Sequence, residues 1–306
     1  MQLISLAGVT IDERKQATRY LRGEGIEIGA SHMPIEVDKT CCSVRYVDRL
    51  NEGEIDQNFP ELRESTLVPV DVICDVVNDG LSPFADGSLD FAIASHLLEH
   101  VPNPLGFIQE CHRVLRAGGY LYLGIPDKEF TFDRDRKRTP LAHLIADFRA
   151  GARAIDEEHL VDYLTKAAKE AIPEDPAART ALFERELGRS FHVHVWTWED
   201  MVELIQYTVT ELKLDWDLAE LFLPKGVKNE AIFILKRSGV DAGTAANRFA
   251  SNLKLLLDRE RAAEQTIALA RKGIEAMELD APHGNGHRSL LSRLRNKFTL
   301  SGKRSG

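Results

Sequence analysis

The sequence has no apolar run long enough to cross a membrane, since a spanning helix needs about 20 such residues. It also has little cysteine. Four cysteines among 306 residues are too few for a disulfide framework. We expect these thiols to be reduced, which favours a cytoplasmic protein.

Basic residues are scarce in most of the chain. The net charge is −9, although residues 283–306 contain six basic residues and no acid. Without those six positive charges, the rest of the chain carries −15. Because contacts to nucleic-acid phosphates need clustered basic side chains, we expect no nucleic-acid partner for this acidic body.

Strand-like and helix-like patterns alternate between residues 24 and 127. An amphipathic helix is predicted for 96–115, with Gly118 and Gly119 ending it. Apolar strands that alternate with helices indicate an α/β protein with a doubly wound, mostly parallel sheet covered on both faces. The predicted strands are 25–29, 44–48, 68–74, 89–95 and 120–125.

The later part of the chain divides into segments of different character. Residues 191–198 are expected to form a strand or extended segment, and Thr197 is expected to cap a helix over 199–207. A last apolar strand is predicted at 231–235. The predicted organisation is a domain over 1–237 with a helical insertion or lid at about 128–190, a linker and long helix over 238–282, and a basic tail over 283–306.

A single long helix is predicted for residues 245–279. Apolar residues recur at alternating spacings of four and three, with Glu260 the one polar member. This spacing suits a coiled coil that joins a second copy or a protein partner, and it equally suits a helix lying on its own domain. The seam consists of Phe249, Leu253, Leu256, Glu260, Ala263, Ile267, Ala270, Ile274 and Met277.

The basic tail carries a short apolar stripe. Leu290, Leu291, Leu294 and Phe298 would lie on one side of a helix, with basic residues interleaved. Such a helix suits an anionic membrane surface, which would make the protein peripheral at the inner face of the membrane. The glycines around the stripe equally favour a disordered tail.

Several polar residues follow the predicted strands, at the sheet edge where α/β proteins bind ligands. The glycine pattern G-x-G-x-x-G of dinucleotide-binding proteins is absent from the turn after the first strand, where only Gly29 is present. This disfavours a nicotinamide cofactor. Asp48 follows the second strand and is suited to bind a ribose diol. The other residues at this edge are Glu27, Ser31, Asp75, Asp79, Gly80, Ser95 and His96.

The sequence from about 20 to 127 resembles the small-molecule branch of class I S-adenosylmethionine (SAM) methyltransferases. The similar motifs, in order, are 27–29, 46–48, 81–91, 94–101 and 113–119. Residues 125–128, 130–133 and 191–197 are more loosely similar to methyltransferase-domain proteins of bacterial surface-polysaccharide pathways.

The resemblance implies a SAM cofactor and a role for each strand-end residue. Glu27 and Gly29 would meet the methionine end, and Ser31 would offer a hydroxyl in place of a usual glycine. Asp48 would bind the ribose hydroxyls. The remaining implied contacts are Asp79, Gly80 and, less favoured, Asp75 near the adenine, with Ser95 and His96 bordering the cofactor.

Transfer of a methyl group to a hydroxyl is helped by a base that removes the proton. The candidates are His96, His100, Asp127, His192 and His194. His96 and His100 share a face if the helix begins by His96, and His192 and His194 share one if their segment is a strand. We predict no metal, preferring a packed histidine pair to a ligand pair.

The predicted function is O-methylation of a sugar or polysaccharide-related acceptor, with a small molecule or glycan as partner. Two alternatives remain open. One is methylation of a quinone or lipid. The other is a scaffold of the same fold that recruits partners through its C-terminal helix and turns over little or not at all.

Overall fold

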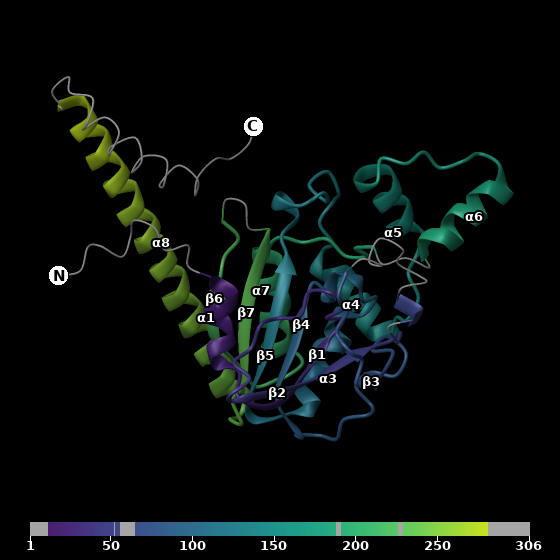
Figure 1. Ribbon diagram of the computed structural model, residues 1–306, viewed down its shortest axis with the longest axis horizontal. Coiled ribbons are helices and arrows are strands. Elements are labelled where there is room, and N and C mark those ends of the chain that lie inside the picture. Colours follow the sequence, from purple (N-terminus) through teal and green to yellow (C-terminus); the bar gives the residue numbers. More distant parts are fainter. Residues whose placement is uncertain (1–11, 52, 56–64, 188–190, 226–228, 281–306) are drawn as a thin grey trace.

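A seven-stranded sheet runs through the computed structural model (Figure 1). The structure describes residues 12–51, 53–55, 65–187, 191–225 and 229–280. The strand order is β3-β2-β1-β4-β5-β7-β6, and only β7 runs antiparallel to both its neighbours. The strands are β1 (Gly23–Ile28), β2 (Cys42–Asp48), β3 (Val72–Ile73), β4 (Leu89–Ser95), β5 (Leu115–Pro126), β6 (Trp216–Phe222) and β7 (Glu230–Arg237).

The order of the strands reverses between β1 and β4. From this point β2 and β3 follow on one side, and β5 follows on the other. A crevice forms at such a reversal, outside the carboxyl ends of the strands. The predicted doubly wound, mostly parallel α/β sheet is therefore confirmed, and its ligand-binding edge lies at the ends of β1, β2 and β4.

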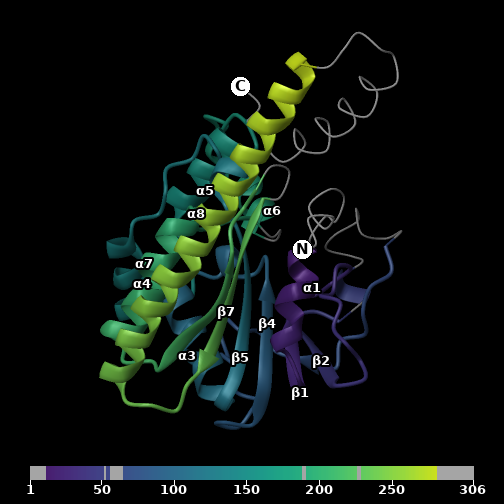
Figure 2. The ribbon, with the colours of Figure 1, turned by 90° about the vertical axis from the view of Figure 1, so that its left-hand side faces the viewer.

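Two hydrophobic layers cover the sheet, one on each face. The larger contains α3, α7 and the start of α8, and the smaller contains α1 with residues of the chain up to Cys42 (Figure 2). Burial on both faces explains why β4 reads as a continuous apolar run. The helices are α1 (Glu13–Ala17), α3 (Pro104–Val114), α4 (Leu141–Ala150), α5 (Glu157–Asp162), α6 (Pro176–Leu187), α7 (Trp198–Thr210) and α8 (Ala242–Asp280).

The predicted helix over 96–115 is wrong at its start and in the residues expected to stop it, although α3 ends at Val114, within one residue of the prediction. His96 has a positive φ of 52°, and α3 begins only at Pro104, after the cap formed by Asn103. Proline is tolerated in a first helical turn but not in a helix interior, so the helix cannot extend back through Pro104. Gly118 and Gly119 do not stop the helix, because they lie within β5.

Two strand predictions also need correction. The third strand is only two residues long, and β6 was not predicted. Residues 191–197 form no strand and continue directly into α7. The predicted cap of α7 is confirmed, because the Asp200 carboxylate accepts hydrogen bonds from the backbone N–H and the hydroxyl of Thr197.

The predicted helical insertion contains α4, α5, a π-helical turn (Tyr163–Ala167) and α6. It has a small core of its own, formed by Leu160, Leu164 and Leu182 with Phe191 and Val193. The insertion projects to one side of the sheet, as α5 and α6 show in Figure 1.

The long helix α8 begins on its own domain and then leaves it (Figure 1). Phe249 and Leu256 are buried in the main core, and Arg259 donates to the Glu220 carboxylate of β6. Glu260 is paired with Lys225 rather than with a second helix. The first half of the predicted seam therefore packs within the chain, while residues 261–266 are all exposed. A coiled coil over the second half stays a prediction.

No helix in the described part of the chain is long and apolar enough to cross a membrane. All four cysteines are free thiols. The basic tail lies outside the described residues.

Candidate functional site

Glu27 lies at the carboxyl end of β1 with its side chain buried. One carboxylate oxygen, Oε1, accepts the backbone N–H of Ile35 at 2.9 Å. The other, Oε2, has no hydrogen-bond partner among the described residues. Burial raises the pKa of Glu27 to about 7, because the ionised form loses its hydration. This carboxylate is poised to receive a donor or a cation from a ligand.

The turn after β1 bends through two left-handed residues. Gly29 has φ of +71° and Ser31 has φ of +48°. Glycine adopts this conformation freely, whereas serine does so at a cost. Met33 points outward and is 59% exposed, so it does not fill the turn. The backbone at this turn thus bends sharply without help from further glycines.

Asp48 ends β2 next to β1, in the place expected for a ribose-binding acid. Its carboxylate oxygen Oδ1 accepts the N–H of Leu50 at 3.2 Å, and its backbone carbonyl accepts the N–H of Cys74 at 2.8 Å. Burial raises the pKa of Asp48. The chain after β3 is therefore tied to the end of β2.

Asp75, Asp79 and Gly80 follow β3 in a turn. The Asp75 carboxylate accepts the N–H of Val77 at 3.0 Å and the side-chain amide of Asn78 at 2.8 Å, so it holds its own turn. Asp79 is exposed, and Gly80 has φ of +60°. Of the three, the exposed Asp79 has the side chain most accessible to a ligand.

His96 follows Ser95 at the end of β4 and is part of a chain of ion pairs. Its Nε2 lies 3.0 Å from Glu230 Oε2, and Arg14 holds the same carboxylate at 2.7 and 2.9 Å. Burial opposes the charged imidazole, but the bond to Glu230 and the charge of Glu99 outweigh it and raise the pKa of His96. Burial likewise opposes the ionised Glu230, yet bonds from His96 and Arg14 lower its pKa to about 2.

A second polar group lies beside His96, and we call it the Glu99 cluster: Glu99, His96, His100 and His192. Glu99 Oε1 lies 3.6 Å from His96 Nδ1, 3.9 Å from His100 Nε2 and 3.8 Å from His192 Nε2. The Glu99 side chain is buried, whereas the three imidazoles are partly exposed. Burial lowers the pKa of His100 and keeps it neutral.

Asp127, a candidate base, is held in a structural position. Its two carboxylate oxygens accept the backbone N–H groups of Glu129 at 2.9 Å and Trp198 at 3.0 Å. It thereby joins the end of β5 to the start of α7. Burial raises the pKa of Asp127. With both oxygens engaged, this placement favours support of the fold over proton transfer.

His192 and His194 do not share a face, contrary to the expectation from a strand. The backbone carbonyl of Glu99 accepts the N–H groups of Val193 at 2.7 Å and His194 at 3.1 Å. This pins the segment so that His192 joins Glu99 and His194 faces the insertion. Sequence spacing could not show this, because the alternation of faces applies only to a regular strand.

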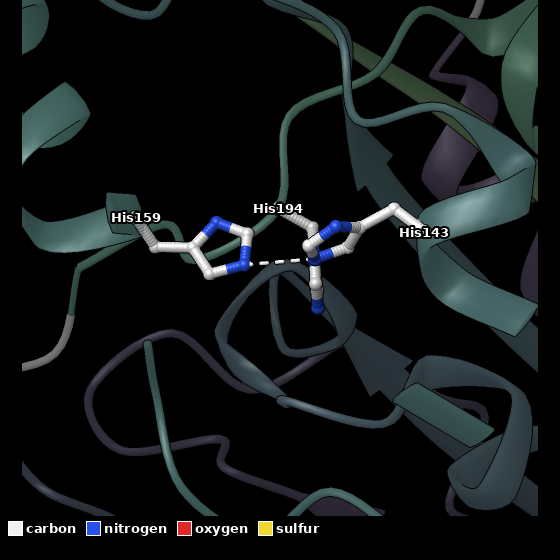
Figure 3. A group of neighbouring side chains, drawn as sticks. All are labelled: His143, His159 and His194. Carbon is white, nitrogen blue, oxygen red and sulfur yellow. Dashed lines mark hydrogen bonds between the residues drawn. The ribbon is translucent and has the colours of Figure 1, made fainter. Parts of the chain in front are cut away.

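We call the group around His194 the His194 cluster. It consists of His143 of α4, His159 of α5 and His194 (Figure 3), together with Asp147 beside His143. The Nε2 atoms of His143 and His159 lie 3.0 Å apart, and His143 Nε2 lies 3.2 Å from Asp147 Oδ2. His194 Nε2 donates to the carbonyl of Pro102 at 3.3 Å. Burial and the neighbouring His159 lower the pKa of His194 to about 3.

Sequence reasoning missed four residues of this region: Arg14, Glu99, Asp133 and Glu230. Glu99 lies in a motif that we quoted, between two candidate histidines, so its position was a usable signal. Arg14 and Glu230 are 216 residues apart, and nothing in the local pattern connects them. Arg136, within the predicted insertion, is buried and paired with Asp133 and Asp162.

The strand ends fit a SAM cofactor. The unpartnered Oε2 of Glu27 is a ready acceptor for an ammonium group, and the half-buried Asp48 lies one strand away. At Gly29, an added Cβ would lie 3.2 Å from Leu97, so the backbone itself lines the turn. A buried carboxylate, an adjacent acid and an open backbone turn are the groups that the resemblance assigns to this cofactor.

Comparison with known proteins agrees with this assignment. Residues 28–123, just under a third of the chain, match the family described as "Methyltransferase domain". A 45-residue stretch is 47% identical to an uncharacterised 37.1 kDa protein of transposon TN4556 from Streptomyces fradiae. That match spans 15% of this chain and only 13% of the relative, so the relative says nothing about the whole protein.

Two solved structures are similar in fold. A SAM-dependent methyltransferase from Methanosarcina mazei is 21% identical, with 72% of this chain and 95% of that chain covered and a TM-score of 0.38. A protein from Rhodobacter sphaeroides, provisionally named a zinc-dependent alcohol dehydrogenase, is 15% identical, with 76% and 91% covered and a TM-score of 0.47. Both TM-scores are below 0.5, and we draw no functional conclusion from them.

The family match and the doubly wound sheet agree on one activity. Residues 28–123 match a methyltransferase domain, and S-adenosyl-L-methionine is the cofactor that this match and the doubly wound sheet imply. A domain of this kind suggests a small-molecule acceptor.

Proposed function

We propose that the protein transfers a methyl group from SAM to a hydroxyl oxygen of a sugar or polysaccharide-related acceptor. The observation that carries the proposal is His96, an imidazole 32% exposed that lies at the end of β4 and is bonded to Glu230. This position is next to the strand ends that fit the cofactor. A hydroxyl acceptor is the kind that benefits from such a base.

When bound, SAM supplies a methyl group already activated on a sulfonium centre, so the protein contributes alignment and proton removal. His96 Nε2 faces Glu230, so Nδ1, which lies 3.6 Å from Glu99 Oε1, is the nitrogen that would take the acceptor proton. Arg14 fixes the Glu230 carboxylate through two bonds and so holds the imidazole ring in place. These three residues come from different parts of the chain and meet at the carboxyl end of β4.

The chemistry beside His96 supports a sugar as the acceptor class. Phe130 and Phe132 are 42% and 59% exposed, although large apolar side chains are usually covered. The ring of Phe132 lies 4.8 Å from that of His192, next to the Glu99 cluster. A sugar has apolar C–H faces and polar edges, and exposed rings beside hydrogen-bonding groups match both.

Two measurements test the proposal in order. Saturating S-adenosylhomocysteine should raise the melting temperature, since a ligand at 100 times its dissociation constant adds about 2.7 kcal/mol of stability. Formation of S-adenosylhomocysteine from SAM is then followed with fractions of cell extract as acceptors. Sugar-containing fractions should support it, and quinone or lipid fractions should not.

A negative result in each of the two measurements leads to a different conclusion. Absence of a melting shift would refute the cofactor site itself. Binding without turnover on any fraction would leave a scaffold, and turnover on quinones or lipids would refute the acceptor class.

We also propose docking at an anionic membrane from the cytoplasmic side, through residues 283–306. The support is the interleaved basic and apolar pattern of that segment. Flotation with anionic liposomes should fall when the chain is shortened to end at Pro282. Equal flotation of both chains would remove the tail as an anchor.

A further inference from the structure

We propose that Glu99, His100 and His192 bind a divalent transition-metal ion. One ligand atom from each residue lies within 4.8 Å of the other two. Two imidazoles and one carboxylate form a donor set used by zinc and by non-haem iron in proteins. The sequence alone led us to expect no metal, and the arrangement of these side chains changes that expectation.

The Glu99 carboxylate is the first reason. Its side chain is 1% exposed, and neither oxygen accepts a hydrogen bond in the described part of the chain. A buried carboxylate without a partner is costly, because the ionised group loses its hydration and gains nothing in return. A cation between Glu99 and the imidazoles would offset this cost.

The outer partners of the two histidines are the second reason. His100 Nδ1 donates to the carbonyl of Phe191 at 2.8 Å, and His192 Nδ1 donates to Asp133 Oδ2 at 2.5 Å. Both imidazoles are therefore held with Nε2 directed toward Glu99. Metal-binding histidines are typically oriented in this way, by a carbonyl or carboxylate on the opposite ring nitrogen.

The distances are the third reason. Glu99 Oε1 lies 3.9 Å from His100 Nε2 and 3.8 Å from His192 Nε2. Ligand bonds of about 2.1 Å place neighbouring atoms of a tetrahedral site about 3.4 Å apart. Small rotations of the side chains close this difference. The histidine side chains are 23% and 12% exposed, so a coordination position remains open toward solvent.

An open coordination position beside His96 would give the metal a role in methyl transfer, an inference that rests on the proposed function. A hydroxyl bound to a divalent metal loses its proton more easily, because the metal stabilises the alkoxide. The metal would then help position and acidify the acceptor. Metal binding itself does not depend on this step, because it is measured without cofactor or acceptor.

The test is metal binding by the full chain after treatment with a chelator and removal of that chelator. The probes are Zn²⁺, followed by calorimetry and elemental analysis, and Co²⁺, followed by its visible absorption. We expect one equivalent per chain. Glu99→Gln and His192→Ala should each weaken binding at least about tenfold, as loss of a supporting residue alone already does in metal sites. His143→Ala, which changes the His194 cluster, is the matched control and should retain the full equivalent.

Circular dichroism and the melting shift with S-adenosylhomocysteine verify that each variant is folded. The proposal is wrong if the parent binds no metal, which would leave only the direct contacts between Glu99 and the imidazoles. It is equally wrong if binding survives in Glu99→Gln and His192→Ala but is lost in His143→Ala. Retained metal with no methyl transfer would instead refute only the proposed function.

Discussion

The Glu99 cluster and the His194 cluster each take one histidine from the same short segment, His192 and His194, and their histidines bond in different ways. In the Glu99 cluster, the outer nitrogens are bonded to Glu230, Phe191 and Asp133, and the inner ones point at a buried carboxylate. In the His194 cluster, His143 and His159 bond to each other, and both come from helices of the insertion.

This difference distinguishes a group that can bind a ligand from a group that joins structural elements. Inner nitrogens that converge on an unpartnered anion leave an interaction for a ligand to complete. In the His194 cluster, His143 and His159 already bond to each other and His194 Nε2 bonds to backbone, while His194 Nδ1 has no hydrogen-bond partner among the described residues. These bonds join α4 and α5 to the segment before α7. The histidine count is equal in the two clusters, so only the bonding pattern distinguishes them.

The largest expected effect is on turnover. His96→Ala should lower the rate of S-adenosylhomocysteine formation by about 10² to 10⁴, because loss of a general base typically costs that much. Binding of S-adenosylhomocysteine should change little. His143→Ala is the counterpart in the other cluster and should retain near-parent activity. Equal losses of rate in both variants would contradict the proposed distinction between the two clusters.

The next effect is on acid stability. The pKa of His194 is about 3 in the fold and about 6.5 in the unfolded chain, so the unfolded chain binds more protons in between. The resulting stability is complete above pH 6.5 and is lost as the pH falls toward 3. The loss amounts to as much as about 4 kcal/mol.

Urea unfolding of the parent and of His194→Asn at several pH values isolates this contribution. The gap between their unfolding free energies should narrow as the pH falls below 6.5. A gap that is constant from pH 7 to pH 4 would show that His194 is not held neutral.

A smaller effect concerns the cofactor edge. Asp48→Ala should weaken S-adenosylhomocysteine binding about 10- to 100-fold, because a hydrogen bond to a charged group contributes about 1.5–3 kcal/mol. Asp147→Ala removes the acid of the His194 cluster and should leave the affinity unchanged. Calorimetry with S-adenosylhomocysteine on the two variants decides whether Asp48 is part of the cofactor site.

The smallest expected effect is on stability, through backbone strain at Ser31 and at Lys169. Ser31 and Lys169 both have positive φ, one at the cofactor turn and one in the insertion. Glycine at either position should raise stability by up to about 1 kcal/mol, since it adopts this conformation without strain. Only Ser31→Gly should also weaken S-adenosylhomocysteine binding, by a few-fold, through the lost hydroxyl. Equal binding in both variants would remove Ser31 from the cofactor site.

Much of the fold followed from the sequence because it depends on local patterns. Buried parallel strands read as apolar runs, which is why β4 was predicted with its observed bounds, Leu89–Ser95. The long helix was predicted from its periodicity and the cap of α7 from Thr197. The helix over 96–115 was wrong because its apolar spacing was followed past Pro102 and Pro104, whose chemistry should have ended it.

The sequence by itself determined the residue types at the strand ends, since Glu27, Asp48 and His96 each lie at or directly after the end of a strand that local pattern defines. Only the tertiary structure decided what these residues meet. Arg14, His96 and Glu230 are distant in the chain, and the pairing of β5 with β7 brings Glu230 to the end of β4. His192 and His194 were separated by two backbone hydrogen bonds to Glu99. Periodicity reports which face of an element is buried, whereas partners across the fold depend on how the elements pack.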